Sequence, residues 1–261
     1  ISHAFASDNN TANWTQLSWP NQAQTDFFAA WDSTFLVIND GTEILRSGNS
    51  GANWQSVHQT SGKVYDLKRI GDKAWLATTE TKIYRSTDDG VTWEETPAPY
   101  DATGLGYAQL SIFPTEIGAF VKIYNDTTST IYRTVDQGNS WSVLPLPTNN
   151  NYYNVGDMVF LNGKLFITDG GLMSSADEGQ SWYRHGTPNT LDVEKDGNTL
   201  CIGGSDGFFK SFDAGETWWT GNVGWETALG QVSSPFFHPD QIHYHQGKLY
   251  LFSYGENYVS G

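Results

Sequence analysis

An eight-residue turn pattern recurs six times in this chain and constrains its fold more than any other feature. The clearest copy, residues 86–93, reads Ser-Thr-Asp-Asp-Gly-Val-Thr-Trp, or S-x-D-x-G-x-[TS]-W in general form. The six copies end at Trp14, Trp54, Trp93, Trp141, Trp182 and Trp218. The steps between these tryptophans are 40, 39, 48, 41 and 36 residues, and a period near 40 indicates a repeat fold. We call these segments the tryptophan turns.

The residue types in the turn point to a structural role. The Asp side chain accepts backbone N–H bonds, as in an Asx turn, and the Gly two positions later takes a positive φ without steric cost. The Trp returns the chain to a strand and buries a large ring, which stabilises by at most roughly 4–6 kcal/mol. The residues with these roles are Asp88, Asp136, Asp177, Asp213, Trp54, Trp93, Trp141, Trp182 and Trp218. Asn9 and Asn49 replace Asp and Thr11 replaces Gly, so we expect those two turns to be less well formed.

This pattern resembles the Asp-box, also called the BNR repeat, and the resemblance covers the whole chain. It implies a β-propeller in which each box joins the third and fourth strands of a blade, on the rim away from the usual ligand face. Proteins with this motif include sialidases, other glycan-active propellers, the sortilin-type receptor domain and a photosystem assembly factor. The resemblance is therefore specific for the fold and only weakly specific for the function.

The segments between the turns read as strands joined by tight turns. Apolar residues alternate over 63–70, Gly71-Asp72 follows as a turn, and 74–77 is apolar again. Asn162-Gly163 separates two further apolar runs, which is the strongest short hairpin signal. Each repeat therefore carries four strands, as a propeller blade does.

These observations predict an all-β fold: one domain, residues 1–261, forming a six-bladed β-propeller of four-stranded antiparallel blades. Strands are expected near 241–245 and 248–253, while residues 1–18 hold the last strands of a blade without its first two. We therefore expect the N- and C-terminal strands to share one blade and close the ring, which removes free sheet edges. The third strand of that blade comes either from 257–260 or from 2–7.

Composition excludes several kinds of partner. The net charge is −15, with 14 Lys and Arg against 29 Asp and Glu, so phosphate-rich nucleic acid is a poor partner. No run of 18 apolar residues is present, so we expect no membrane insertion. We also expect no cofactor and no metal site, because His243 and His245 lack a third ligand and the calcium-loop spacing is missing. Cys201, within an apolar run, is interpreted as a buried small hydrophobic residue.

The ligand face is expected where long loops interrupt the period. Residues 97–107, 146–157 and 220–240 are rich in Tyr, Trp, Asn and carboxylates, a mixture suited to sugar rings and polar ligands. The candidate ligand-binding residues are Tyr100, Asp101, Tyr152, Tyr153, Trp225 and Glu226. For each aromatic residue the alternative is packing against a neighbouring blade.

Sialidase activity is disfavoured because that chemistry uses three arginines to bind a carboxylate. Arg46, Arg85 and Arg133 all stand just before a tryptophan turn, and this equivalence indicates a structural role at the rim. Only Arg69 and Arg184 remain, which are too few for a triad.

The leading hypothesis is a secreted or cell-surface propeller, without catalysis, that recognises a glycan or an extracellular protein through its loop face. Location in the periplasm is also compatible, and the chain, which begins with Ile1, is expected to be a mature form or part of a larger multidomain protein. The alternative is a glycoside hydrolase or polysaccharide lyase with two facing loop carboxylates, one with a raised pKa, although no catalytic residue is assigned. A third hypothesis, an assembly factor with a basic patch, fits poorly with so few cations.

Overall fold

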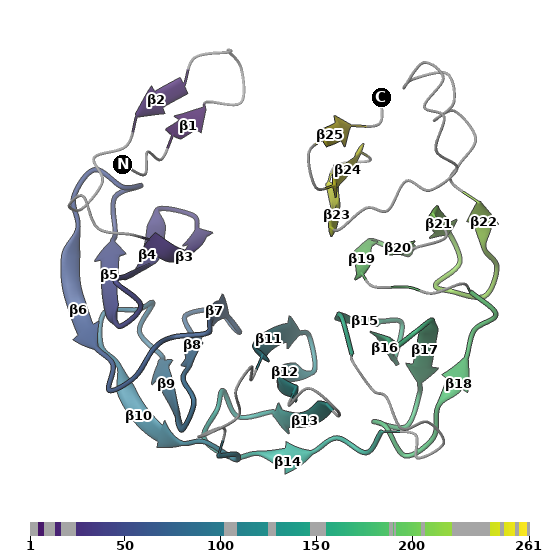
Figure 1. The fold of residues 1–261 in the computed structure, drawn as a ribbon, viewed down its shortest axis with the longest axis horizontal. Coiled ribbons are helices and arrows are strands. Elements are labelled where there is room, and N and C mark those ends of the chain that lie inside the picture. Colours follow the sequence, from purple (N-terminus) through teal and green to yellow (C-terminus); the bar gives the residue numbers. More distant parts are fainter. Residues whose placement is uncertain are drawn as a thin grey trace. The chain divides into compact units, whose positions relative to one another are not determined.

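The structure is a computed structural model that describes strands and the turns between them (Figure 1). The described residues are 5–7, 14–16, 25–101, 109–124, 129–146, 155–187, 190, 192–204, 207–220, 241–245, 248–253 and 256–259. Every regular element in these ranges is a β-strand, which confirms the all-β prediction. Within the same ranges, no helix has the length and apolar character needed to cross a bilayer.

Five sheets each consist of four antiparallel strands that follow one another in the chain. The first sheet is β3 (Thr25–Trp31), β4 (Thr34–Asn39), β5 (Glu43–Ser47) and β6 (Gln55–Gln59). The second is β7 (Asp66–Arg69), β8 (Trp75–Thr78), β9 (Lys82–Ser86) and β10 (Glu94–Pro97). The third is β11 (Gln109–Thr115), β12 (Gly118–Tyr124), β13 (Ser129–Thr134) and β14 (Ser142–Val143). The fourth is β15 (Met158–Leu161), β16 (Lys164–Thr168), β17 (Leu172–Ser175) and β18 (Tyr183–Arg184), and the fifth is β19 (Asp192–Asp196), β20 (Thr199–Gly204), β21 (Gly207–Ser211) and β22 (Trp219–Thr220).

The strands near the two ends of the chain form smaller sheets. β1 (Phe5–Ser7) pairs with β2 (Trp14–Gln16), and β23 (Gln241–His245), β24 (Lys248–Ser253) and β25 (Glu256–Val259) form a three-stranded sheet. The third strand beside β24 is therefore β25, while β1 pairs with β2. The sharing of one blade by both ends, and with it the count of six blades, stays a prediction.

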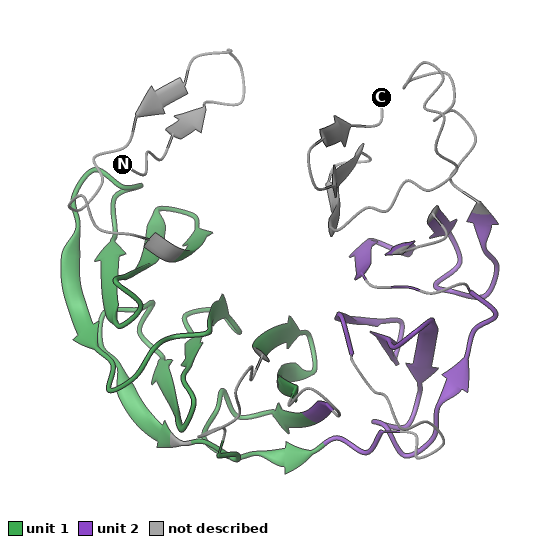
Figure 2. Ribbon diagram, in the orientation of Figure 1, with its two compact units in different colours: residues 1–126, 131–143 green, residues 127–130, 144–261 purple. Residues whose placement is uncertain are grey.

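The chain divides into two compact units (Figure 2). Unit 1 comprises residues 1–126 and 131–143 and carries the sheets from β1 to β14, apart from the first residues of β13. Unit 2 comprises residues 127–130 and 144–261 and carries the sheets from β15 to β25. The assignment of 1–261 to one domain stays a prediction.

Antiparallel alternation gives each sheet two distinct ends. The links between strands one and two and between strands three and four lie at one end, which we call the turn end because it carries the tryptophan turns. The links between strands two and three, and the connections to the next sheet, lie at the other end, which we call the loop end. At the turn end of the second sheet, the Asp89 N–H donates to the Lys73 carbonyl at 2.9 Å, which joins the tryptophan turn to the β7–β8 link.

Side chains replace backbone partners within each tryptophan turn. In the turn of residues 86–93, the Ser86 hydroxyl donates to Asp88 Oδ1 at 2.9 Å and accepts the Gly90 N–H at 2.8 Å. Asp88 Oδ1 also accepts the Thr92 N–H at 2.8 Å, and Oδ2 accepts the Thr92 hydroxyl at 2.6 Å. The turns that contain Asp136, Asp177 and Asp213 repeat all four bonds. In all four turns the aspartate therefore accepts hydrogen bonds from groups of its own turn.

The looser turn of residues 47–54 is better formed than the sequence predicts. Asn49 Oδ1 accepts the Ser47 hydroxyl at 2.9 Å and the Asn53 N–H at 2.9 Å, and Ser47 Oγ accepts the Gly51 N–H at 2.8 Å. A single amide oxygen suffices for these bonds, and only the bond to a second carboxylate oxygen is lost. The turn that ends at Trp14 lies outside the described residues.

Three of the turn glycines serve both conformation and packing. Their φ is positive, +80° at Gly90 and +89° at Gly138 and Gly215. A Cβ atom would lie 3.0 Å from Leu36 Cδ2 at Gly90, 2.9 Å from Leu76 Cδ2 at Gly138 and 3.0 Å from Phe166 Cε1 at Gly215. Leu36, Leu76 and Phe166 are fully buried residues in the second strand of the preceding sheet. The turns therefore also hold neighbouring sheets together.

The turn tryptophans are less buried than the sequence predicts. Trp54, Trp93, Trp141, Trp182 and Trp218 are all half-buried. Trp93, Trp141 and Trp218 pack against buried cores while staying partly exposed, so each contributes less than the roughly 4–6 kcal/mol of full burial. Among the residues whose burial the structure describes, the fully buried tryptophan is Trp75 in β8, which packs with Leu36, Leu67 and Tyr84 in the core between the first two sheets.

We predict that Gly138→Ala destabilises the protein by about 2–4 kcal/mol, because it combines left-handed strain of about 1–2 kcal/mol with overpacking against Leu76 of about 1–3 kcal/mol. Gly163→Ala is the matched control, since Gly163 has φ +77° but open space around it. We expect this control to cost about 1 kcal/mol, from strain alone. Urea unfolding monitored by tryptophan fluorescence measures both, and equal losses would refute the packing role.

Candidate functional site

Four of the six predicted ligand-binding residues, Tyr152, Tyr153, Trp225 and Glu226, lie outside the described residues. Tyr100 and Asp101 follow β10, on the connection to the third sheet. The Tyr100 hydroxyl donates to the Thr79 carbonyl at 3.0 Å, and its ring packs against the apolar core between the second and third sheets. Burial raises the pKa of Tyr100. Tyr100 therefore takes part in packing between sheets, whereas Asp101 is exposed beside it.

Hydrogen bonds place the loops at the loop end of unit 1 side by side. The Val64 N–H donates to the Gly41 carbonyl at 2.7 Å, and the Tyr65 N–H donates to the Thr78 carbonyl at 2.8 Å. The bond from Tyr100 to the Thr79 carbonyl extends this chain of contacts to the third sheet. The links after β4, β6, β8 and β10 therefore form one continuous surface.

This surface is acidic. Asp40, Glu80 and Asp101 are exposed and Glu43 is half-exposed, and we call these four residues the acidic loop end. Two of the four carboxylates are held by neighbours: Glu80 Oε1 accepts the Tyr65 hydroxyl at 2.8 Å, and Glu43 Oε2 accepts the Asn39 amide at 2.8 Å. The bond to Glu80 is the main cause that raises the pKa of Tyr65. The cations nearby are the exposed Lys63 and the half-buried Lys82, and Lys82 forms an ion pair with Glu95.

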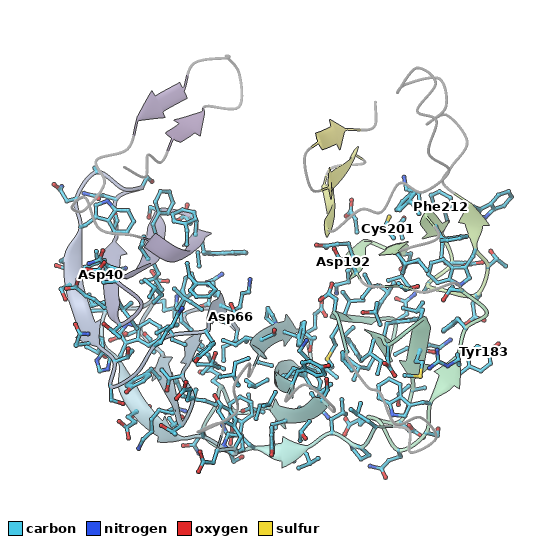
Figure 3. The ribbon with its side chains drawn as sticks, viewed as in Figure 1. Asp40, Asp66, Tyr183, Asp192, Cys201 and Phe212 are labelled. Carbon is cyan, nitrogen blue, oxygen red and sulfur yellow. The ribbon has the colours of Figure 1, made fainter. Side chains whose placement is uncertain are left out.

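A second group of carboxylates stands at the start of the first strands. Asp66, which begins β7, accepts its neighbour Leu67 N–H at 2.8 Å through Oδ1 and the Ile112 N–H of β11 at 2.7 Å through Oδ2. Burial is the main cause that raises the pKa of Asp66, while Lys68, 3.9 Å away, acts in the opposite direction. The carboxylate of Asp66, which is labelled in Figure 3, therefore joins the second sheet to the third.

Unit 2 repeats this arrangement with Asp157, which precedes β15. Its Oδ1 accepts the Met158 N–H at 2.7 Å, and its Oδ2 accepts the Val193 N–H of β19 at 3.3 Å. Asp192 immediately precedes Val193, and its carboxyl forms a hydrogen bond with that of Asp157. Burial first, and then the bond and charge of Asp192, raise the pKa of Asp157 well above its usual range.

Sequence reasoning did not identify Asp66, Asp157 and Asp192 as a set. The available signal is an Asp directly before the first apolar residue of a blade, as in Asp66-Leu67, Asp157-Met158 and Asp192-Val193. Asp157 has the raised pKa expected of a hydrolase acid. Glycoside hydrolysis places its two carboxyls about 5–9.5 Å apart, however, whereas Asp192 is close enough to Asp157 to interact with it through a hydrogen bond.

All five arginines have partners within the protein. Arg46 Nε donates to the Asp89 carbonyl at 2.8 Å, and its guanidinium lies 3.2 Å from Asp89 Oδ2 in the next turn. The other four have these partners: Arg85 pairs with Glu94, Arg133 donates to the Ile117 carbonyl, Arg184 donates to the Asp169 carbonyl, and Arg69 lies 4.0 Å over the Trp31 ring. The structural role predicted for the arginines before the turns is confirmed, although each binds a different kind of partner.

Other reactive residue types serve packing in the part of the chain that the structure describes. Cys201 is fully buried, as predicted, and burial raises the pKa of its thiol to about 12. No group of three His, Cys, Asp or Glu that could hold a metal ion occurs among the described residues. The side chains of His243 and His245 are outside that set.

Two family models match parts of the chain. The model described as sortilin, neurotensin receptor 3, matches residues 42–164, and that of the DUF6242 beta propeller domain matches residues 116–236. Each covers less than half of the chain, and no curated protein matches the sequence.

Solved structures match over more of the chain. A structure titled "YCF48 bound to D1 peptide" matches with a TM-score of 0.69 and 13% identity, covering 96% of this chain and 83% of that one. YCF48 from Cyanidioschyzon merolae matches with a TM-score of 0.62 and 15% identity, covering 92% and 82%. The Niastella koreensis GH74 enzyme matches with a TM-score of 0.53 and 19% identity, covering 72% of this chain but only 29% of that chain. With the four-stranded antiparallel sheets, these likenesses show that the chain has a β-propeller fold.

We predict that Asp89→Ala destabilises the protein by roughly 1–2 kcal/mol, because it removes the carboxylate bound by Arg46, Thr34 and Trp75. Gln137→Ala is the control, since Gln137 occupies the same turn position with a similar positive φ and is exposed. We expect the control to change the free energy of unfolding by less than about 0.5 kcal/mol. Equal effects of the two variants in chemical unfolding would contradict a specific contact between sheets.

Proposed function

We propose that this chain is a non-catalytic β-propeller that binds a protein partner at its acidic loop end, through an extended segment rich in Lys and Arg. The observation that carries the proposal is the continuous surface on which Asp40, Glu80 and Asp101 are exposed. Loops on a rigid sheet scaffold are a common place for recognition. The Tyr65 ring beside Glu80 adds an aromatic surface to the carboxylates.

The negative charge of this surface favours a positively charged partner. Carboxylates on neighbouring loops create a negative potential that attracts basic segments and speeds their association. The net charge of −15 acts in the same direction over longer distances. Because the carboxylates are exposed, salt should screen the attraction.

The likeness to YCF48 supports a peptide as the ligand class. That structure contains a bound D1 peptide and is matched over 83% of its chain, whereas the GH74 enzyme is matched over 29% of its chain. Because one fold hosts many functions, the likeness carries less weight than the surface itself.

The enzyme alternative receives less support from the described residues. Asp157 and Asp192 stand too close for either geometry of glycoside hydrolysis. The arginines that a sialidase would aim at its substrate are engaged within the protein. A glycan remains the other ligand class for the same loop face.

Two further assignments belong to this proposal. We assign the tryptophan turns to the Asp-box type, because the Ser, Asp and Gly of that pattern make the same hydrogen bonds in four copies. We place the protein outside the cell or at the cell surface, with the periplasm as the bacterial equivalent. This location rests on the resemblance of the turns to those of extracellular propellers.

We predict that a fluorescent Lys-rich peptide binds the protein and that a Glu-rich peptide of equal length does not, as measured by fluorescence anisotropy. Raising the salt from about 50 to 300 mM should weaken binding roughly tenfold. Asp40→Lys should weaken binding several-fold. Asp72→Lys is the matched control, since it makes the same charge change at the turn end of the same unit and should have little effect.

Two results would count against this proposal. Equal weakening by Asp40→Lys and Asp72→Lys would mean that only the net charge matters. Binding on a glycan array without any peptide binding would assign the loop face to carbohydrate instead.

A further inference from the structure

Two histidines occupy the same position of the repeat, one in each unit. His58 on β6 pairs with Ile44 on β5. The His185 N–H, just after β18, donates to the Leu172 carbonyl of β17 at 2.9 Å. Ile44 and Leu172 each stand three residues before the Ser that begins a tryptophan turn. In the second sheet Thr96 holds this position, so the fold itself does not require a histidine there.

Each histidine ring packs against an aromatic ring of the next sheet. The centroid of the His58 ring lies 5.0 Å from that of the Tyr84 ring on β9. The His185 ring lies 6.3 Å from the Trp218 ring, edge to face, and 4.9 Å from the Tyr183 ring of its own sheet. The two imidazoles therefore form part of the contacts between the first and second sheets and between the fourth and fifth.

The surroundings of both rings suit a neutral imidazole. His58 Nε2 is enclosed and has no hydrogen-bond partner among the described residues. An imidazolium carries an N–H on both nitrogens, so a proton at this atom would leave a buried donor unsatisfied. His185 is buried, and its Nε2 lies 3.0 Å from the Ser174 hydroxyl. Burial is the main cause that lowers the pKa of both histidines.

The charged groups that act on the two rings are themselves paired. Glu95 on β10 favours protonation of His58, but it forms an ion pair with Lys82. Lys164 disfavours protonation of His185 and Glu216 favours it, and these two residues also form an ion pair. The remaining charged residues on β5, β9, β10, β18 and β21 and in the turn after β21 are Glu43, Arg46, Arg85, Glu94, Arg184, Lys210 and Asp213.

Tyr84 connects His58 to the loop that follows β6. Its hydroxyl accepts the Ser61 N–H at 2.8 Å and lies 2.8 Å from the Ser61 hydroxyl. Three residues further on, the Val64 N–H donates to the Gly41 carbonyl. The ring that packs on His58 therefore also anchors a segment of the loop-end surface of unit 1.

We propose that His58 and His185 are acid-sensitive contacts, one in each unit, that hold neighbouring sheets together when neutral and weaken when protonated. Protonation places a cation among apolar and aromatic groups, where it loses its water. In unit 1, a weaker contact between His58 and Tyr84 also loosens the segment at Ser61. Mild acid thereby regulates the order of the loop-end surface.

The direction of the pH effect follows from linkage. Because the pKa of each histidine is lower in the folded than in the unfolded chain, the unfolded chain takes up the proton first. The contribution to stability is therefore complete above about pH 6.5 and is lost as pH falls through the folded pKa values. Asp66 and Asp157 have raised pKa values and act in the opposite direction, so the test compares variants over one pH interval.

The test measures how far the urea unfolding midpoint falls between about pH 7.5 and pH 5. His58→Thr gives the first sheet the residue of the second, and His185→Gln replaces the titrating ring with a neutral amide. Each midpoint should fall less than that of the unaltered protein, and the midpoint of the double variant should fall least. Gln55→His is the control, because Gln55 is exposed on β6 and a histidine there should leave the fall unchanged. If His58→Thr does not fold, His58→Gln takes its place.

Two direct measurements complete the test. In NMR titrations, the ring signals that disappear in His58→Thr and His185→Gln should have midpoints below about pH 6.5 in the unaltered protein. Exchange of the Ser61 amide, corrected for its intrinsic pH dependence, should speed up on acidification relative to the Thr92 amide, and this change should be lost in His58→Thr. Ring midpoints at or above about pH 6.5, or equal falls of the unfolding midpoint with and without the histidines, would overturn the proposal. Equal acid effects on Ser61 exchange with and without His58 would overturn the regulation of the loop end.

Discussion

The hydroxyl–carboxylate–glycine contact in each tryptophan turn is the interaction on which the rest of the fold depends. A buried Ser or Thr hydroxyl binds the Asp carboxylate and accepts the glycine N–H, so side chains satisfy backbone groups that no strand reaches. The same geometry leaves the glycine without a Cβ at the place where the preceding sheet approaches, as at Leu76 beside Gly138. One short segment therefore sets both the local turn and the distance between neighbouring sheets. These contacts lie at the turn end of the sheets, so they do not constrain the sequence or length of the links at the loop end.

The loop end is held by a different chemistry. There, Asp66 and Asp157 join first strands of neighbouring sheets through single carboxylates. A glycine packed against leucine does not respond to pH or to charge, whereas a carboxylate between two sheets responds to both. Within each unit, the loop end of the sheets therefore carries ionisable contacts between sheets, as the Arg46–Asp89 ion pair does at the turn end of unit 1. A charged partner at that surface would meet carboxylates of two kinds, exposed ones on loops and enclosed ones between sheets.

The sequence predicted the strands and turns that recur in each repeat, but it did not predict the contacts between one repeat and the next. The period near 40 residues and the Asp and Gly positions were enough to place four strands in each of five sheets, because these signals are local. The partners of Asp66 and Tyr100 are Ile112 and Thr79, which stand 46 and 21 positions away in another sheet. No local pattern predicts such a bond, so the sequence left both ligand binding and packing open for Tyr100, and the structure shows it packing between sheets. The turn tryptophans were expected to be buried for a related reason, since residue type does not reveal how far neighbouring sheets cover a ring.

The arginines before the tryptophan turns indicate where function has to be sought. Arg46, Arg85 and Arg133 occupy one position of the repeat, yet they bind a carboxylate of the next turn, a carboxylate of the same sheet and a backbone carbonyl. The arginine at this position of the repeat thus binds another part of the protein in each sheet, although the group that it binds differs. Residues at repeating positions therefore indicate the fold. The residues that determine which partner is recognised have to be sought at positions that do not repeat. In this chain those are the carboxylates on the loops after β4, β8 and β10, where the scaffold imposes position but not residue type.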